Sequence, residues 1–191
     1  MSLSVRRLSL PGVLEIVPTQ HSDDRGLFSE VWNASDLARL GVIVDFIQDN
    51  HSISRPRGVM RGLHYQLPPF AQDKLVRVVR GAIFDVAVDI NPDSRTFGRW
   101  VSAELSATRW NQLFVPAGYA HGFVTTEPDT EVIYKVSNPY SCEHERSIRF
   151  DDPQLAIAWP IEADDMLLSE KDRLAPTLEA ADLPAMGENV A

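Results

Sequence analysis

The feature that most constrains the fold is a series of short segments in which apolar and polar residues alternate, each bounded by Gly, Pro, Asn or Asp. Alternation with a period of two is typical of half-buried β-strands. The predicted strands are residues 13–17, 27–32, 44–48, 59–66, 74–79, 83–90, 99–105, 111–115, 121–125 and 131–136. Many short strands at this spacing favour an antiparallel all-β sandwich or barrel, including jelly rolls.

Few helices are expected. Residues 35–40 are predicted as a short helix with Ser35 as its N-cap, and another short helix is predicted to begin at Ser169. With 191 residues and a hydrophobic share of 44%, the chain has enough apolar material for one core. We therefore expect a single domain over residues 1–175. Residues 176–191 lose the alternation, and we expect them to form a loosely ordered acidic tail.

Charge excludes some classes of function. The chain carries 18 Lys and Arg against 27 Asp and Glu, which makes a nucleic-acid partner or an anionic membrane surface unexpected. Residues 55–80 are the exception, since they hold six basic residues and one acid. This region is either a solvated basic face or a pocket for a small anion such as a phosphate ester.

Three further features bear on location. Cys142 is the single cysteine and cannot form an intrachain disulfide, which favours a reducing, cytoplasmic environment. Residues 1–10 lack the apolar run of a secretory signal. The longest uncharged stretch, residues 110–126, is too short and too polar for a membrane span.

In two predicted strands the alternation places a polar side chain on the apolar face. Lys74 shares a strand face with Val76 and Val78, and a buried lysine is costly unless it is paired or used. It could instead extend to solvent from the end of its strand. Tyr134 shares a face with Val132, so its ring is expected to point inward. Both residues are candidates for a functional cavity.

Two segments, residues 58–66 and 116–121, resemble the signature motifs of the cupin superfamily, a small jelly-roll β-barrel. In metal-binding cupins these motifs supply three His and one Glu. The corresponding positions here are His64, Gln66, Lys74 and His121. The ammonium of Lys74 would repel a divalent cation, and such sites need at least three protein ligands. The resemblance therefore implies the fold without a metal or other cofactor.

A closer resemblance covers about residues 10–175. Nine strings in order resemble the dTDP-4-dehydrorhamnose 3,5-epimerase family, at residues 24–26, 48–52, 61–66, 74–77, 84–90, 96–98, 118–123, 134–135 and 168–172. This implies an isomerase that inverts C3 and C5 of dTDP-4-keto-6-deoxyglucose through enolate intermediates to give dTDP-4-keto-L-rhamnose. It also implies a homodimer whose ligand is a dTDP-linked 4-keto-6-deoxy sugar.

The residue types suit this chemistry. A C4 ketone acidifies the hydrogens at C3 and C5, so inversion needs a base, an acid on the other face and a group that stabilises the enolate. By resemblance, His64 is the base and Asp172 orients it. Tyr134 is the acid, Lys74 stabilises the enolate, and His121 lies nearby.

The family pattern also implies binding residues. Arg25 and Arg61 would contact the diphosphate, since guanidinium groups match its oxygens. The other expected contacts to the sugar and base are Phe28, Glu30, Gln48, Asp49, Asn50, Tyr140, Glu145 and Lys171. Arg61 and His64 would lie on opposite faces of a regular strand, so either a β-bulge or a partner subunit must bring them together.

Three alternatives remain open from the sequence. A 3-epimerase that inverts a single centre uses the same residue types. A non-catalytic cupin that binds nucleotide sugars would bind without isotope exchange. A metal-dependent cupin oxygenase or isomerase would require bound metal.

Overall fold

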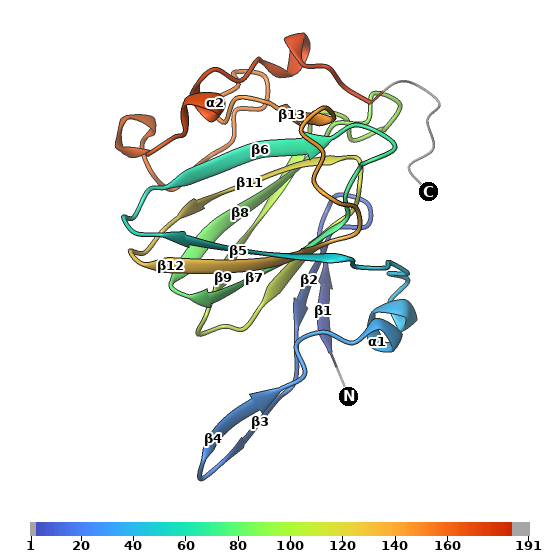
Figure 1. Ribbon diagram of the computed structural model, residues 1–191, viewed down its shortest axis with the longest axis vertical. Helices are drawn as coiled ribbons and strands as arrows, with labels where there is room; N and C mark the ends of the chain where they lie inside the picture. The colour runs from blue at the N-terminus through green and yellow to red at the C-terminus, as the bar shows by residue number, and fades with distance from the viewer. Residues whose placement is uncertain (1–2, 185–191) are drawn as a thin grey trace.

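The computed structural model describes residues 3–184 as two antiparallel β-sheets packed as a sandwich (Figure 1). The larger sheet has the order β1 (Ser4–Arg7), β2 (Leu14–Val17), β10 (Gln112–Val115), β7 (Lys74–Arg80), β12 (Thr130–Val136) and β5 (Gln48–Ser54). The smaller sheet has the order β13 (Glu145–Ser147), β6 (Met60–Gln66), β11 (Tyr119–Thr125), β8 (Ala82–Asp89) and β9 (Trp100–Ser106). The all-β, cupin-type prediction is confirmed.

Smaller elements surround the sandwich. A hairpin of β3 (Gln20–Asp23) and β4 (Gly26–Ser29) extends away from it in Figure 1. Helix α1 (Ala34–Arg39) lies beside the larger sheet, and α2 (Glu170–Arg173) lies above β6. Single 3₁₀ turns cover Ala163–Asp165 and Leu178–Ala180. The described residues contain no helix long and apolar enough to cross a membrane.

Two local predictions were wrong. Residues 44–48 were predicted as a strand, but the strand at this place runs over Gln48–Ser54. Val44 and Phe46 pack on an apolar cluster that covers the outer face of the larger sheet. This packing explains the apolar alternation of residues 44–48, although they do not pair as a strand. Helix α1 is capped by Asn33, whose side chain accepts from two backbone N–H groups, and not by Ser35.

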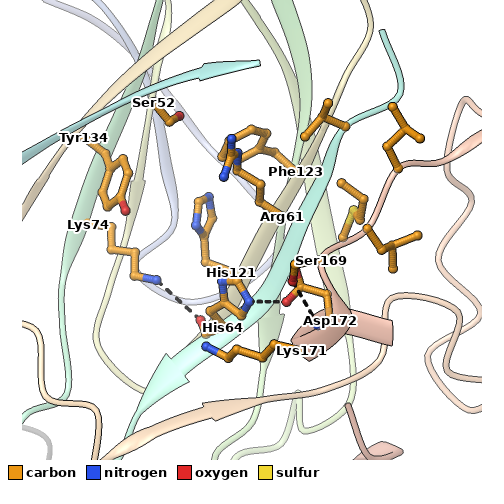
Figure 2. Close-up of a pocket in the computed structure, with 14 residues that line it drawn as sticks. Ser52, Arg61, His64, Lys74, His121, Phe123, Tyr134, Ser169, Lys171 and Asp172 are labelled. Atoms are coloured by element: carbon orange, nitrogen blue, oxygen red, sulfur yellow. Dashed lines mark hydrogen bonds and ion pairs between the residues drawn. The ribbon is translucent and has the colours of Figure 1, made fainter. Parts of the chain in front are cut away.

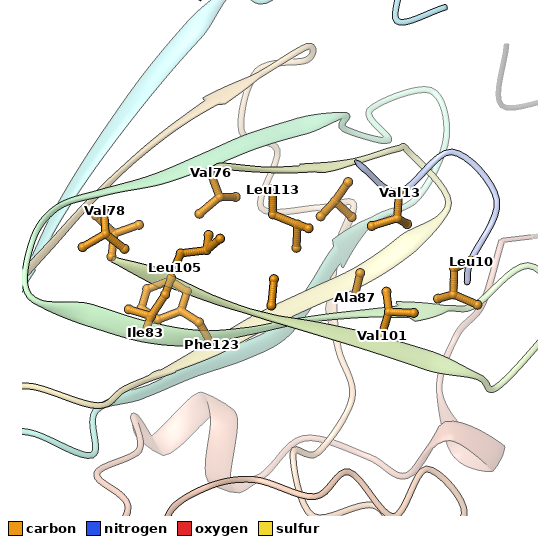
Figure 3. Packing of buried hydrophobic residues seen from close by; sticks show 13 residues of the cluster. Leu10, Val13, Val76, Val78, Ile83, Ala87, Val101, Leu105, Leu113 and Phe123 are labelled. Carbon is orange, nitrogen blue, oxygen red and sulfur yellow. The ribbon is translucent and has the colours of Figure 1, made fainter. Parts of the chain in front are cut away.

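The main apolar cluster fills the space between the sheets (Figure 3). It includes Val76 of β7, Ile83 of β8, Leu113 of β10 and Val132 of β12, each fully buried. Phe123 of β11 belongs both to this cluster and to the lining of a cavity of about 460 Å³ between the sheets. Phe123 therefore lies where the apolar core meets the cavity.

The smaller sheet is also covered on its outer face. Val86 and Val88 of β8 pack there against Leu155 and Leu178 of the C-terminal segment. Strand β8 is thus buried on both sides. Because side chains alternate along a strand, Asp85 points the opposite way from Val86, into the interior between the sheets. Leu178 lies within the expected tail, so the described chain is packed beyond residue 175. The single-domain division stays a prediction, and residues 185–191 lie outside the described residues.

A β-bulge in β6 places two predicted site residues on one side of the sheet. His64 pairs with His121 of β11, whereas Arg61 pairs with Phe123, so β6 advances three residues while β11 advances two. The extra residue is accommodated at Gly62, which has φ 124°. A Cβ at this position would lie 2.5 Å from the Cα of Gly122. Because of this bulge, the side chains of Arg61 and His64 line the same cavity.

Substitution of Gly62 with alanine is expected to destabilise the protein strongly. Its Cβ meets backbone atoms that cannot move aside, and overpacking of this kind costs about 1–3 kcal/mol. Gly26→Ala is the matched control, because Gly26 has φ 134° and a methyl group added there would meet no atom within 4 Å. Denaturant unfolding should show the larger loss in Gly62→Ala. Equal losses in the two variants would show that the close approach of β6 and β11 is unimportant.

Candidate active site

A cavity of about 460 Å³ opens between the two sheets (Figure 2). Its polar lining comes from both sheets and from the C-terminal segment that carries α2. The lining residues predicted from the sequence are Arg61, His64, Lys74, His121, Tyr134, Lys171 and Asp172. The fold thus brings together the whole expected catalytic set from strands β6, β7, β11 and β12 and from helix α2.

His64 and Asp172 form a hydrogen-bonded pair. The Nε2 atom of His64 lies 2.5 Å from Oδ1 of Asp172. Ser169, the N-cap of α2, donates its hydroxyl to Oδ2 of Asp172 at 2.9 Å and accepts from the backbone N–H of the same residue. Both carboxylate oxygens therefore have a hydrogen-bond partner. Ser169 holds the carboxylate in place, and the carboxylate fixes the orientation of the His64 imidazole through Oδ1.

The electrostatics of Asp172 favour a carboxylate. Burial raises its pKa, but the hydrogen bond and charge of His64 and the hydroxyl of Ser169 outweigh burial, so the pKa lies below its usual value. A charged Asp172 stabilises the imidazolium that forms when His64 accepts a proton. The geometry and charge of the pair are therefore compatible with His64 acting as a base.

Lys74 is buried at the start of β7, with 8% of its surface exposed. Among residues 3–184 its ammonium makes one hydrogen bond, a long one of 3.4 Å to the backbone oxygen of His64. Burial lowers the pKa of Lys74 to about 8, although Asp85 and Glu145 oppose this change. The ammonium is therefore charged at neutral pH and has donor capacity to spare for an oxyanion.

Tyr134 of β12 lies across the cavity from Asp172, on the same side as Lys74 (Figure 2). Its strand neighbours Val132 and Val136 are fully buried, which confirms the predicted inward orientation. Burial raises the pKa of its phenol, so the group stays protonated at neutral pH. No hydroxyl partner exists among the described residues, which leaves the O–H free for a ligand.

A smaller cavity of about 130 Å³ adjoins the first and shares His64, Lys74 and Tyr134 with it. It contains four predicted binding residues, which are Gln48, Asn50, Tyr140 and Glu145. Gln48 donates to Asn50, and the phenol of Tyr140 donates to Glu145 at 2.9 Å. Glu145 also pairs with Lys171 at 2.5 Å. The smaller cavity therefore has a mostly polar lining next to the larger one.

Four predicted binding residues lie outside both cavities. Asp49 points to the other face of β5 and pairs with Lys135. Arg25 and Phe28 lie on the projecting hairpin, and Glu30 lies just after it. The side chain of Arg25 is 90% exposed and contacts only Asp23 among the described residues. Within one protomer these four side chains do not reach the site.

Two polar residues of the site were missed. Ser52 lines the cavity from β5, and its hydroxyl is buried without a hydrogen-bond partner among residues 3–184. Its signal was the alternation Gln48, Asn50, Ser52, Ser54, which places four polar residues on the inner face of one strand. Ser169 was predicted only as the start of a short helix, and its contact with Asp172 follows from the Ser-x-x-Asp spacing of a capped helix start.

The positions equivalent to cupin metal ligands serve other purposes here. Gln66 uses its amide to bind the backbone oxygens of Phe70 and Pro139, at 2.6 and 3.1 Å, and accepts from the backbone N–H of Ser141. In residues 3–184 no three His, Cys, Asp or Glu side chains are arranged to hold a metal ion.

Comparison with known proteins shows which family the chain matches. A family model described as dTDP-4-dehydrorhamnose 3,5-epimerase matches residues 7–180. The dTDP-4-dehydrorhamnose 3,5-epimerase of Sinorhizobium fredii is 51% identical over 171 residues, which cover 90% of this chain and 87% of that protein. The Legionella pneumophila dTDP-6-deoxy-D-glucose-3,5-epimerase, solved with dTDP-4-keto-L-rhamnose, has a TM-score of 0.91 and 41% identity over 96% of this chain and 98% of its own.

A structure with a different printed activity is also similar. The 3′-monoepimerase of Streptomyces bikiniensis, solved with dTDP-quinovose, has a TM-score of 0.83 and 38% identity. The match covers 90% of this chain and 86% of that chain. The fold is thus common to enzymes that invert one centre and to enzymes that invert two.

Proposed function

The chain belongs to the dTDP-4-dehydrorhamnose 3,5-epimerase family, and from this premise we propose how its residues invert C3 and C5 of dTDP-4-keto-6-deoxyglucose. His64 removes the proton, Asp172 orients His64, Lys74 stabilises the enolate oxygen, and Tyr134 returns a proton to the opposite face. The observation that carries the proposal is the shared cavity, in which a carboxylate-held imidazole, a buried ammonium and an unpaired phenol surround one space.

One base can act at both centres. In the chair form of a gluco-configured ring the hydrogens at C3 and C5 are both axial and lie on the same face. Both carbons are adjacent to the C4 ketone, so loss of either proton gives an enolate with its charge on the same oxygen. A single ammonium near that oxygen, that of Lys74, therefore serves both steps. Tyr134 then protonates carbon from the face opposite His64.

The product's configuration tests the assignment of two centres. The enzyme is incubated with dTDP-4-keto-6-deoxyglucose, and proton couplings of the sugar are measured by NMR. We expect inversion at C3 and at C5, giving dTDP-4-keto-L-rhamnose. Inversion at C3 alone would make the chain a single-centre epimerase. Tight binding with no conversion would support a binding protein.

Tyr134→Phe is expected to separate proton removal from inversion. The variant keeps the ring and its packing but loses the hydroxyl that protonates the far face. His64 can still take a proton and return it to the same face. In deuterated water, recovered substrate should gain deuterium faster than inverted product forms. If exchange and inversion fall by the same factor, Tyr134 supports proton removal and another group is the acid.

We infer a homodimer in which the hairpin of one protomer completes the site of the other. Arg25 and Phe28 are exposed on a hairpin that extends away from its own sandwich (Figure 1). Strand β5, whose inner face carries Gln48 and Asn50, is an edge strand of the larger sheet. An edge strand offers unpaired backbone groups to an incoming strand. Reciprocal exchange would produce an isologous dimer.

Mixing two inactive variants tests this arrangement. In a mixed dimer of His64→Ala and Arg25→Ala protomers, one site carries both changes and the other carries neither. We expect each homodimer to be impaired and the mixture, after subunit exchange, to regain up to half of the activity per mixed dimer. Recovery that is absent despite formation of mixed dimers would show that Arg25 acts within its own protomer or not at all.

A cytoplasmic location is also proposed. It is supported by Cys142, which is free and exposed, because exposed thiols persist in reducing compartments. Fractionation of cells that produce the untagged protein tests it, and recovery in a secreted or membrane fraction would contradict it.

A further inference from the structure

His121, which lines the cavity, and Asp85, which is buried behind it, form a second imidazole–carboxylate pair that the mechanism above does not use. Nε2 of His121 lies 2.5 Å from Oδ1 of Asp85. We propose that Asp85 is a positioning residue with two tasks: it fixes His121 so that Nδ1 accepts a hydrogen bond from a sugar hydroxyl, and it supplies the counter-charge that keeps Lys74 protonated. This inference rests on the proposed function and assigns the groups behind its site.

The burial of Asp85 is the first argument. Asp85 has no exposed surface, and its second oxygen, Oδ2, has no hydrogen-bond partner among residues 3–184. A buried carboxylate is costly unless a charge or donors compensate it. One hydrogen bond from an imidazole leaves that cost only partly offset. A cation close by would offset the rest, and Lys74 is the one buried Lys or Arg side chain among residues 3–184.

The surroundings of Lys74 point to the same pairing. Burial lowers its pKa to about 8, and Asp85 is the strongest influence in the opposite direction. Glu145 of β13 acts like Asp85, and Lys171 of α2 acts against it. The remaining titratable or charged side chains around the cavity are Arg61 and His64 of β6, His121 of β11, Tyr134 of β12 and Asp172 of α2.

These charges differ in whether they are already compensated. Glu145 pairs with Lys171 at 2.5 Å and accepts from Tyr140, and Asp172 is held by His64 and Ser169. Asp85 has only the imidazole of His121 as a partner among residues 3–184, and its Oδ2 is left without a donor. Its negative charge is therefore the one left to balance the ammonium of Lys74.

The hydrogen bond also decides what His121 can offer to the substrate. A carboxylate accepts and cannot donate, so the shared proton sits on Nε2 of His121. In the neutral ring, Nδ1 then carries a lone pair, and it has no partner among the described residues. His121 therefore accepts from a hydroxyl of the sugar and does not donate to the enolate. Lys74 remains the charged donor.

Asp85→Asn tests both tasks, because the amide keeps the size and one acceptor but removes the charge. Asp89→Asn is the matched control: Asp89 lies on the same face of β8, is 2% exposed, and binds Ser94 and Thr96 away from the cavity. The pH dependence of deuterium exchange is measured for the parent and both variants. In Asp85→Asn only, we expect the fall of the exchange rate at alkaline pH to begin roughly one to three pH units lower than in the parent. A uniform loss at every pH, matched by Asp89→Asn, would reduce Asp85 to a structural role.

Two NMR measurements keep the inference separate from the proposed function. The ¹⁵N signals of His121 should show a protonated Nε2 and a bare Nδ1 in the parent, and Nδ1–H should become populated in Asp85→Asn. The titration of the Lys74 side chain should shift down in the same variant. Both observations need no turnover. A parent with Nδ1–H, or a Lys74 titration that Asp85→Asn leaves unchanged, would overturn the inference even in an active enzyme.

Discussion

His64→Ala is expected to abolish proton exchange at both C3 and C5 while nucleotide affinity stays within a few-fold. General base catalysis contributes roughly 10²–10⁴-fold to the rate, and the loss should reach that size at each carbon. The two losses should be equal because one imidazole serves both centres. Binding should persist because the residues proposed to contact the diphosphate and the base do not include His64. Exchange is measured by NMR in deuterated water, and affinity is measured with dTDP.

The matched control removes an imidazole outside the cavity. His144 bonds to Ser141 and packs on Phe70, so His144→Ala should retain exchange. Substantial exchange at C5 in His64→Ala would show that a second base acts there. Equal loss in both variants would point to a general effect on folding.

Lys74→Met is expected to lower the rate of proton removal by about 10²–10³-fold at both carbons, since the enolate oxygen loses its charged donor. Methionine fills much of the same volume without burying a charge, so the variant should remain folded. Lys135→Met is the control, because Lys135 lies on the same sheet but pairs with Asp49 outside the cavities. It should leave proton removal unchanged.

The pH profile adds a second readout for Lys74. Burial lowers its pKa to about 8, so the ammonium is charged below this pH and loses its proton as the pH rises through it. The parent rate should fall over that range, and the residual rate of Lys74→Met should lack this limb. A limb near pH 8 that survives in Lys74→Met would assign the titration to another group.

Much of the architecture was predictable because its strands alternate around a single interior. Lys74 shares a face with Val76 and Val78, and Tyr134 with Val132 and Val136, and both placements follow from period-two geometry alone. The roles of His64 and Asp172 could not be derived in this way. They are 108 positions apart in sequence, and only the resemblance to a family paired them before the structure was known.

The remaining features depend on tertiary context. Strand β5 was misplaced because its inner face is polar and lines the two cavities. A search for alternating apolar residues does not detect such a strand. The inward placement of both Arg61 and His64 depends on a bulge that requires Gly62 beside Gly122. Arg25 and Phe28 lie on a hairpin where both side chains are exposed within one protomer, so the single chain does not place them at the site.

Wild-type turnover in deuterated water tests the central claim most directly, namely that one base, one enolate donor and one acid act at two carbons. The product and the recovered substrate are analysed by NMR for deuterium at C3 and C5 separately. The account predicts solvent deuterium at both carbons, with inversion at both in the product. Deuterium at C3 alone would contradict it and leave a single-centre epimerase, and deuterium at neither carbon would remove the catalytic assignment altogether.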